Sequence, residues 1–165
     1  MKIAVTDANI FIDLIKTEML GFLFNLGLEI HTTYEVYNQL NNEQVKFTNI
    51  FVQSNLLFLY SFSSEELEEL SLLDFPAGLE IADRSVFFYA HKSDALILSG
   101  DRKFKKFCER NSKEVKGIIW VFEEIVNKEL LPAKIVAEKL LLLLTINTRL
   151  PLEECQQRIK KWNAS

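Results

Sequence analysis

Four acidic residues are the side chains in this sequence most capable of chemistry. They are Asp7, Glu35, Asp83 and Asp101. Carboxylate oxygens are the ligands that Mg²⁺ and Mn²⁺ prefer in proteins, and four carboxylates in one crevice would repel one another strongly without a cation. A divalent ion held in this way activates water and neutralises charge on a phosphodiester during in-line attack. The four acids therefore predict a Mg²⁺ or Mn²⁺ site, provided that the fold brings them together.

Short apolar runs alternate with amphipathic stretches, and this alternation predicts a fold that can bring the four acids together. Strands are expected over residues 3–6, 29–32, 56–61, 95–99 and 115–119. The stretches between them show helical spacing, so each connection is expected to cross over the sheet and return in the same direction. This pattern predicts an α/β protein with three layers, α/β/α, in a Rossmann-like arrangement. Its mostly parallel central sheet would have four to five strands.

The predicted elements place the acids at one edge of the sheet. Asp7 and Asp101 each follow a strand, and ligands of such sheets bind beyond the carboxyl ends of the strands. Glu35 is expected in the first turn of the helix after the second strand. Asp83 is expected early in the helix that precedes residues 95–99. If the strands are parallel, these side chains share one crevice.

The blocks around these acids resemble those of PIN-domain nucleases. Residues 7–14 (DANIFIDL) resemble the opening D-x-N/S block of the family, and residues 34–36 (YEV) resemble its helix-borne Glu. Residues 79–90 resemble the L-S-x-x-D block, and residues 97–104 (ILSGDRKF) resemble the L-T-x-D-x-x-F block. Order and spacing agree over about residues 1–125. A helical extension over about residues 130–163 follows, within a single predicted domain of residues 1–165.

The resemblance implies a metal-dependent endoribonuclease that uses Mg²⁺ or Mn²⁺. In that interpretation Asp7, Glu35, Asp83 and Asp101 are the catalytic residues and hold the metal directly or through water. Small single-domain bacterial members are typically VapC-like toxins that an antitoxin protein silences, and they commonly form homodimers. The sequence departs from the family at Glu80, where a small Ser or Thr is usual, and this leaves open whether Glu80 joins the metal site.

Three polar residues beside the acids are expected to support them. The hydroxyls of Thr6 and Ser99 would donate hydrogen bonds to the carboxylates or to a phosphate oxygen. Ser99 stands where the family usually has Thr. Asn9 would position the catalytic water or one of the carboxylates.

A local cluster of cations follows Asp101 and is expected to contact RNA phosphates. Such a run is usually a solvated face, but its position beside the predicted metal crevice favours phosphate contact. The residues assigned to this role are Arg84, Arg102, Lys103, Lys105 and Lys106.

Composition excludes several other classes of protein. The net charge is −4 over 165 residues, so a generally basic protein that coats nucleic acid or membrane is not expected. Two cysteines and two histidines are too few and too dispersed for a structural zinc site. No signal peptide and no apolar run long enough to span a bilayer is present, so a cytoplasmic protein is expected.

Two alternatives remain beside the nuclease. The first is a catalytically silent PIN scaffold that only binds RNA or protein. The second is a phosphatase of the HAD type, whose D-x-D-x-T motif also begins with an acid after a strand. The sequence Asp7-Ala8-Asn9-Ile10-Phe11 lacks the second Asp and the Thr of that motif.

Overall fold

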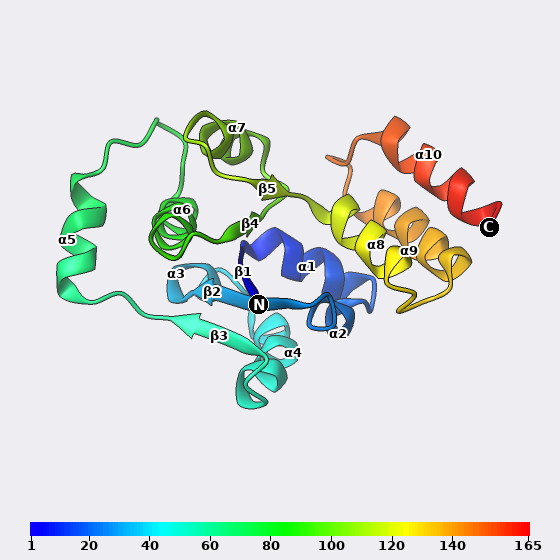
Figure 1. Cartoon of the computed structure of the whole chain (residues 1–165), viewed down its shortest axis with the longest axis horizontal. Coiled ribbons are helices and arrows are strands. Elements are labelled where there is room, and N and C mark those ends of the chain that lie inside the picture. The colour runs from blue at the N-terminus through cyan, green and yellow to red at the C-terminus, as the bar shows by residue number, and fades with distance from the viewer.

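Five parallel strands form the centre of the molecule in the computed structural model, which describes residues 1–165 (Figure 1). The strands are β1 (Lys2–Thr6), β2 (Leu28–Thr33), β3 (Leu57–Tyr60), β4 (Leu96–Leu98) and β5 (Val115–Lys116). They lie in the order β3-β2-β1-β4-β5, and all four neighbouring pairs are parallel. The predicted parallel sheet of four to five strands is therefore confirmed, with five.

Ten helices connect and flank these strands. They are α1 (Ala8–Lys16), α2 (Leu20–Leu23), α3 (Tyr34–Tyr37), α4 (Asn42–Gln53), α5 (Ser64–Leu72), α6 (Ile81–Ser93), α7 (Arg102–Arg110), α8 (Ile118–Asn127), α9 (Ala133–Ile146) and α10 (Leu152–Asn163). None of them combines the length and apolar content needed to cross a bilayer.

The strand order decides which helices share a face of the sheet. The chain moves outward from β1 to β2 and β3, then returns to β4 and continues to β5 in the opposite direction. Because parallel crossovers are right-handed, α1 and α4 must cover one face, and α6 and α7 the other. The contacts agree, since α1 packs against α4, and α6 packs against β1, β2 and β4. The three-layer α/β/α fold predicted from the sequence is confirmed.

The last strand is much shorter than the expected residues 115–119. It ends at Lys116, because Gly117 is the N-cap of α8 and the apolar residues that follow form that helix. The helix after β2 is the single turn α3, which begins after the N-cap Thr33. Apolar runs of this kind fit a buried strand and a buried helix equally well, so their pattern alone could not separate the two.

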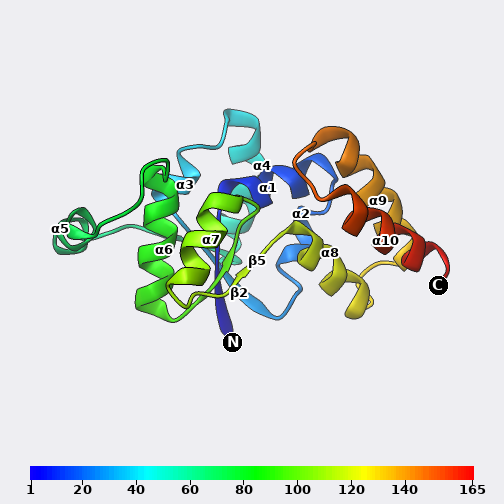
Figure 2. The ribbon, with the colours of Figure 1, turned by 90° about the horizontal axis from the view of Figure 1, so that it is seen from above.

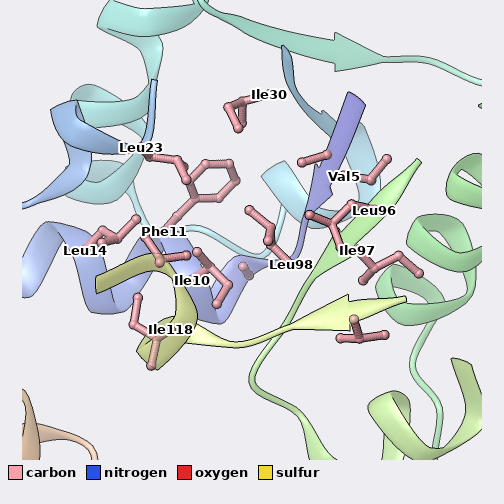
Figure 3. Packing of buried hydrophobic residues seen from close by; sticks show 14 of the residues in the cluster. Val5, Ile10, Phe11, Leu14, Leu23, Ile30, Leu96, Ile97, Leu98 and Ile118 are labelled. Carbon is pink, nitrogen blue, oxygen red and sulfur yellow. The ribbon is translucent and has the colours of Figure 1, made fainter. Parts of the chain in front are cut away.

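The hydrophobic core runs from the sheet into the C-terminal helices (Figure 3). Val5 of β1, Ile97 of β4 and Phe11 of α1 all belong to this cluster, and all three side chains are fully buried. The same cluster continues to Trp162 near the end of α10. The sheet and the C-terminal helices therefore share one hydrophobic core.

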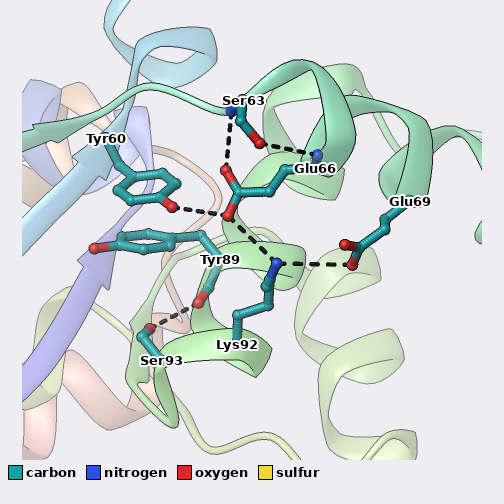
Figure 4. A network of polar contacts seen from close by, with 7 residues as sticks. All are labelled: Tyr60, Ser63, Glu66, Glu69, Tyr89, Lys92 and Ser93. Atoms are coloured by element: carbon teal, nitrogen blue, oxygen red, sulfur yellow. Dashed lines mark hydrogen bonds and ion pairs between the residues drawn. The ribbon is translucent and has the colours of Figure 1, made fainter.

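Helix α5 projects from one end of the molecule, opposite the end where α9 and α10 lie (Figures 1 and 2). None of its side chains is buried. Its first turn is held by Glu66, which accepts hydrogen bonds from Tyr60 Oη at 2.8 Å and from Lys92 Nζ at 3.3 Å (Figure 4). The ring of Tyr60 in turn stacks on Tyr89 of α6, with centroids 3.9 Å apart. A small aromatic and ionic network therefore attaches α5 to α6.

Candidate functional site

The candidate site lies where the strand order reverses, between β1 and β4. Loops that leave the sheet in opposite directions open a crevice at this point. Asp7 follows β1, and Asp101 follows β4 after Ser99 and Gly100. The register pairs Thr6 with Leu98, and the Asp7 N–H donates to the Leu98 carbonyl at 2.9 Å. The sheet itself therefore sets Asp7 beside Ser99.

Asp7 is buried and accepts three hydrogen bonds. As the N-cap of α1, it accepts from the Ala8 N–H at Oδ1, at 2.8 Å. Its Oδ2 accepts from Ser99 Oγ at 2.9 Å and from Asn9 Nδ2 at 3.3 Å. The carboxylate is only 4% exposed, and this burial raises its pKa, with a further contribution from the negative charge of Asp101.

Ser99 and Asn9 also connect Asp7 to the loop that carries Asp101. The Asp101 N–H donates to Ser99 Oγ at 3.2 Å, and the Gly100 N–H donates to Asn9 Oδ1 at 2.9 Å. Asp101 is the N-cap of α7, and its Oδ1 accepts from the Phe104 N–H at 2.8 Å. The two loops thus form one hydrogen-bonded unit, with the second oxygen of Asp101 left free.

Asp83 joins this edge from the first turn of α6. Its Oδ2 accepts from the Glu80 N–H at 3.0 Å, which leaves Oδ1 free. Burial and the negative charges of Asp7, Asp101 and Glu80 together raise its pKa to about 6, against the lowering effect of the Glu80 N–H. Charges act on one another in this way only over short distances. Asp7, Asp83 and Asp101 are called the aspartate cluster below.

The two glutamates near the cluster have different surroundings. Glu80 is exposed, and its Oε2 accepts from Gln39 Nε2 of the α3 segment at 2.9 Å. Glu35 lies in the first turn of α3, which packs against α6. Its Oε2 is buried without a hydrogen-bond partner. Such an atom loses solvation without compensation, so it is a candidate ligand for a cation.

The carboxylate oxygens at this edge of the sheet are of the chemical type that binds a hard divalent cation. Asp83 and Asp101 each keep one free oxygen, and Glu35 holds an unpartnered buried one. As the side chains stand, no three acidic, imidazole or thiol groups lie close enough to hold an ion in common. A shared ion would therefore require side-chain rotation at this edge.

The Thr6 hydroxyl makes no hydrogen bond to the carboxylates, which is one of the two roles expected from the sequence. The hydroxyl is buried without a partner, whereas the Thr6 carbonyl accepts from Thr32 Oγ1 at 2.7 Å. A bond from this hydroxyl to a phosphate oxygen stays a prediction.

Arg84, which is predicted to contact RNA phosphate, also makes contacts within the protein. Its guanidinium lies over the ring of Phe75, 5.5 Å from the centroid, and its Nε donates to the Leu79 carbonyl at 3.1 Å. These contacts hold the segment that leads into α6, and the phosphate contact stays a prediction.

Basic side chains from distant parts of the chain line a groove beside the aspartate cluster. Two clefts, of about 670 and 410 Å³, share the residues around Arg102 and Arg149. Lys16 and Lys105 line the larger cleft, and Asp101 and Lys103 line the smaller one. Together they are called the basic groove below. Lys106 lines neither cleft.

Two cations of the groove were not predicted from the sequence. Lys16 ends α1, and Arg149 lies in the loop between α9 and α10. The loop is more than 45 residues beyond Asp101 in the chain. No sequence pattern signals the position of Arg149, because packing of the C-terminal helices brings it there.

Comparison with known proteins identifies the family. No curated protein matches the chain. Among solved structures, it is similar to a PilT N-terminus domain protein, SSO1118, from the hyperthermophilic archaeon Sulfolobus solfataricus P2. The match has a TM-score of 0.46 and 12% identity, and it covers 72% of this chain and 89% of that chain. The family model DUF3368, described as a PIN domain, matches residues 3–164. Because this match spans almost the whole chain, the protein belongs to the PIN domain family.

Proposed function

We propose that the protein is a Mg²⁺- or Mn²⁺-dependent endoribonuclease whose active site is the aspartate cluster with Glu35. PIN domains are generally nucleases, which hydrolyse phosphodiester bonds. The observation that carries the proposal is the convergence of Asp7, Asp83 and Asp101 at the point where the strand order reverses. They are close enough that the charges of the other two raise the pKa of Asp83.

Each residue has a role that follows from its contacts. Asp83 and Asp101 would hold the ion through their free oxygens, with Asp7 and Glu35 completing the site. When bound, the ion would activate a water and offset charge on the phosphate. Asn9 and Ser99 fix the orientation of Asp7.

The direct test is cleavage of single-stranded and structured RNA with Mn²⁺, Mg²⁺ or a chelator. Asp101→Asn is the sharpest variant, because Asn caps a helix as well as Asp does but lacks the charge. Asp7→Asn is the second variant. Asp74→Asn, at an exposed acid outside the cluster, is the control. We expect ion-dependent cleavage by the wild type and the control, and a loss of about a hundredfold or more in both cluster variants.

The same test separates the alternatives. Equal cleavage by the wild type and both cluster variants would refute the assignment of the site. Absence of cleavage together with retained RNA binding would favour the silent PIN scaffold. That scaffold has one observation behind it, because Asp7 and Asp101 already serve as helix caps. Metal-dependent hydrolysis of a phosphate monoester without RNA cleavage would favour the HAD-type phosphatase instead.

The biological role that we propose is a VapC-like toxin that acts on cytoplasmic RNA, forms a homodimer and is silenced by an antitoxin. Exposed apolar side chains on α4 and α5 supply surface for such partners, for example Ile50 and Leu72, which are 59% and 84% exposed. Induced expression in bacteria should arrest growth for the wild type but not for Asp101→Asn. Sedimentation should give twice the chain mass, and a monomer at all concentrations would contradict the homodimer.

A further inference from the structure

The basic groove contains exposed cations that form no ion pair with an acidic side chain. Lys16, Arg102 and Arg149 form no ion pair, although nine ion pairs and His–carboxylate contacts occur elsewhere in the molecule. All three side chains are exposed, so they can reach a ligand. Lys105 is less free, because it lies 3.8 Å from Glu109. The groove thus keeps a local positive charge in a protein whose net charge is −4.

The loop that carries Arg149 is fixed to the body of the domain. Asn147 Nδ2 donates to Asp13 Oδ2 of α1 at 3.0 Å, and the Arg149 N–H donates to Asn147 Oδ1 at 3.1 Å. Asp13 is only 7% exposed and otherwise lies among buried residues of α1. A buried carboxylate is costly unless it is hydrogen-bonded, so this contact determines where the loop sits. Asp13 is therefore a positioning residue for Arg149.

The order of residues along the groove gives it a direction. Asp101 lines only the smaller cleft, Arg102 and Arg149 line both clefts, and Lys16 lines only the larger one. A chain of negative charges that enters at Asp101 would therefore meet the two arginines first and the lysine afterwards. Glu154 and Asp13 are the acids of the larger cleft, and Asp13 is already bonded to Asn147.

We propose that the basic groove binds the sugar–phosphate backbone of the RNA strand on one side of the scissile phosphate. In this arrangement Arg102 and Arg149 bind the phosphates nearest the aspartate cluster, and Lys16 binds one farther along. The choice of RNA rests on the proposed function. The location of the path rests on the groove alone, because the phosphates of an RNA strand supply the negative charges that its unpaired cations lack.

The test measures RNA binding rather than cleavage. The full-length protein is titrated against a fluorescent single-stranded RNA of mixed sequence, in a chelator, with anisotropy recorded over a range of salt concentrations. The variants are Lys16→Ala and Arg149→Ala. The matched controls are Lys128→Ala and Arg110→Ala, which alter exposed cations without ion pairs outside the groove.

Each lost phosphate contact should lower the dependence of log K on log salt by about 0.7, and should weaken binding about fivefold at about 0.1 M salt. The two controls should stay within about twofold of the wild type. Unchanged affinity and salt dependence in both groove variants would overturn the proposal. If those variants instead lose binding of a polyglutamate peptide, the groove belongs to an acidic protein segment.

Asp13 provides an independent check on how the loop is positioned. Asp13→Ala removes the acceptor for Asn147, so RNA binding should fall about as much as it does in Arg149→Ala. Asp13→Asn keeps an acceptor oxygen and should bind RNA like the wild type. Equal binding by both Asp13 variants would contradict the positioning role. The binding measurements do not depend on cleavage. The proposed nuclease function and the proposed RNA path can therefore be refuted separately.

Discussion

Replacing Asp83 with Asn is expected to stabilise the protein when no divalent ion is present. The substitution removes a carboxylate that is partly buried and repelled by Asp7, Asp101 and Glu80. It keeps the hydrogen bond from the Glu80 N–H, because the amide oxygen of Asn can accept it. The stabilising change therefore acts on charge alone and leaves the first turn of α6 intact.

The size of the effect follows from the pKa of Asp83. A rise from 3.8 to about 6 corresponds to at most about 3 kcal/mol at neutral pH. Because the side chain is only partly buried, solvent screening reduces this to about 1–2 kcal/mol. The folded state holds this proton more tightly than the unfolded state does, so the wild type loses stability as pH rises from about 4 to about 6. The advantage of the variant should grow over that window and then level off.

Thermal unfolding at several pH values measures this directly. Near pH 7.5, Asp83→Asn should melt about 3–6 °C above the wild type. Near pH 4 the difference should almost vanish, and the control Asp74→Asn should show none at either pH. Addition of Mn²⁺ should stabilise the wild type and leave the variant nearly unchanged, since a ligand stabilises only the form that binds it. A variant that is less stable than the wild type without metal at neutral pH would refute the reasoning.

Three further substitutions test the packing and hydrogen bonds that support the site. Ser99→Ala removes the 2.9 Å hydrogen bond to Asp7, and it should lower the free energy of unfolding in urea by about 1–3 kcal/mol. The same variant should lower kcat by a larger factor than it changes KM. Phe104→Ala empties a fully buried position in α7 and should cost about 3–5 kcal/mol by the same assay; retained stability would mean that the core there is not packed as described. Tyr60→Phe removes the hydrogen bond to Glu66, the largest cause of the rise in the pKa of Tyr60 to about 12, and it should speed proteolysis of the α5 segment relative to the wild type.

Sequence patterns were most informative where a local rule fixes the structure. Asp7 and Asp101 follow short apolar runs, and each caps the next helix, as an Asp in that position commonly does. The capping box from Ser63 to Glu66 at the start of α5 obeys a local rule of the same kind. Patterns failed where burial decides between helix and strand, as they did after Gly117.

The sequence by itself determined the parallel α/β fold and the acids that follow its strands, because hydrophobic period and helix capping act over a few residues, and strands that alternate with helices imply crossovers. Tertiary structure alone decided which side chains meet. It left the Thr6 hydroxyl without a partner, it engaged Arg84 with Phe75, and it brought Arg149 to the groove through Asp13. The physical reason is that these contacts depend on how the layers pack, and the bond between Asp13 and Asn147 joins opposite ends of the chain. Their free energies depend on burial and charge that exist only after the layers have packed.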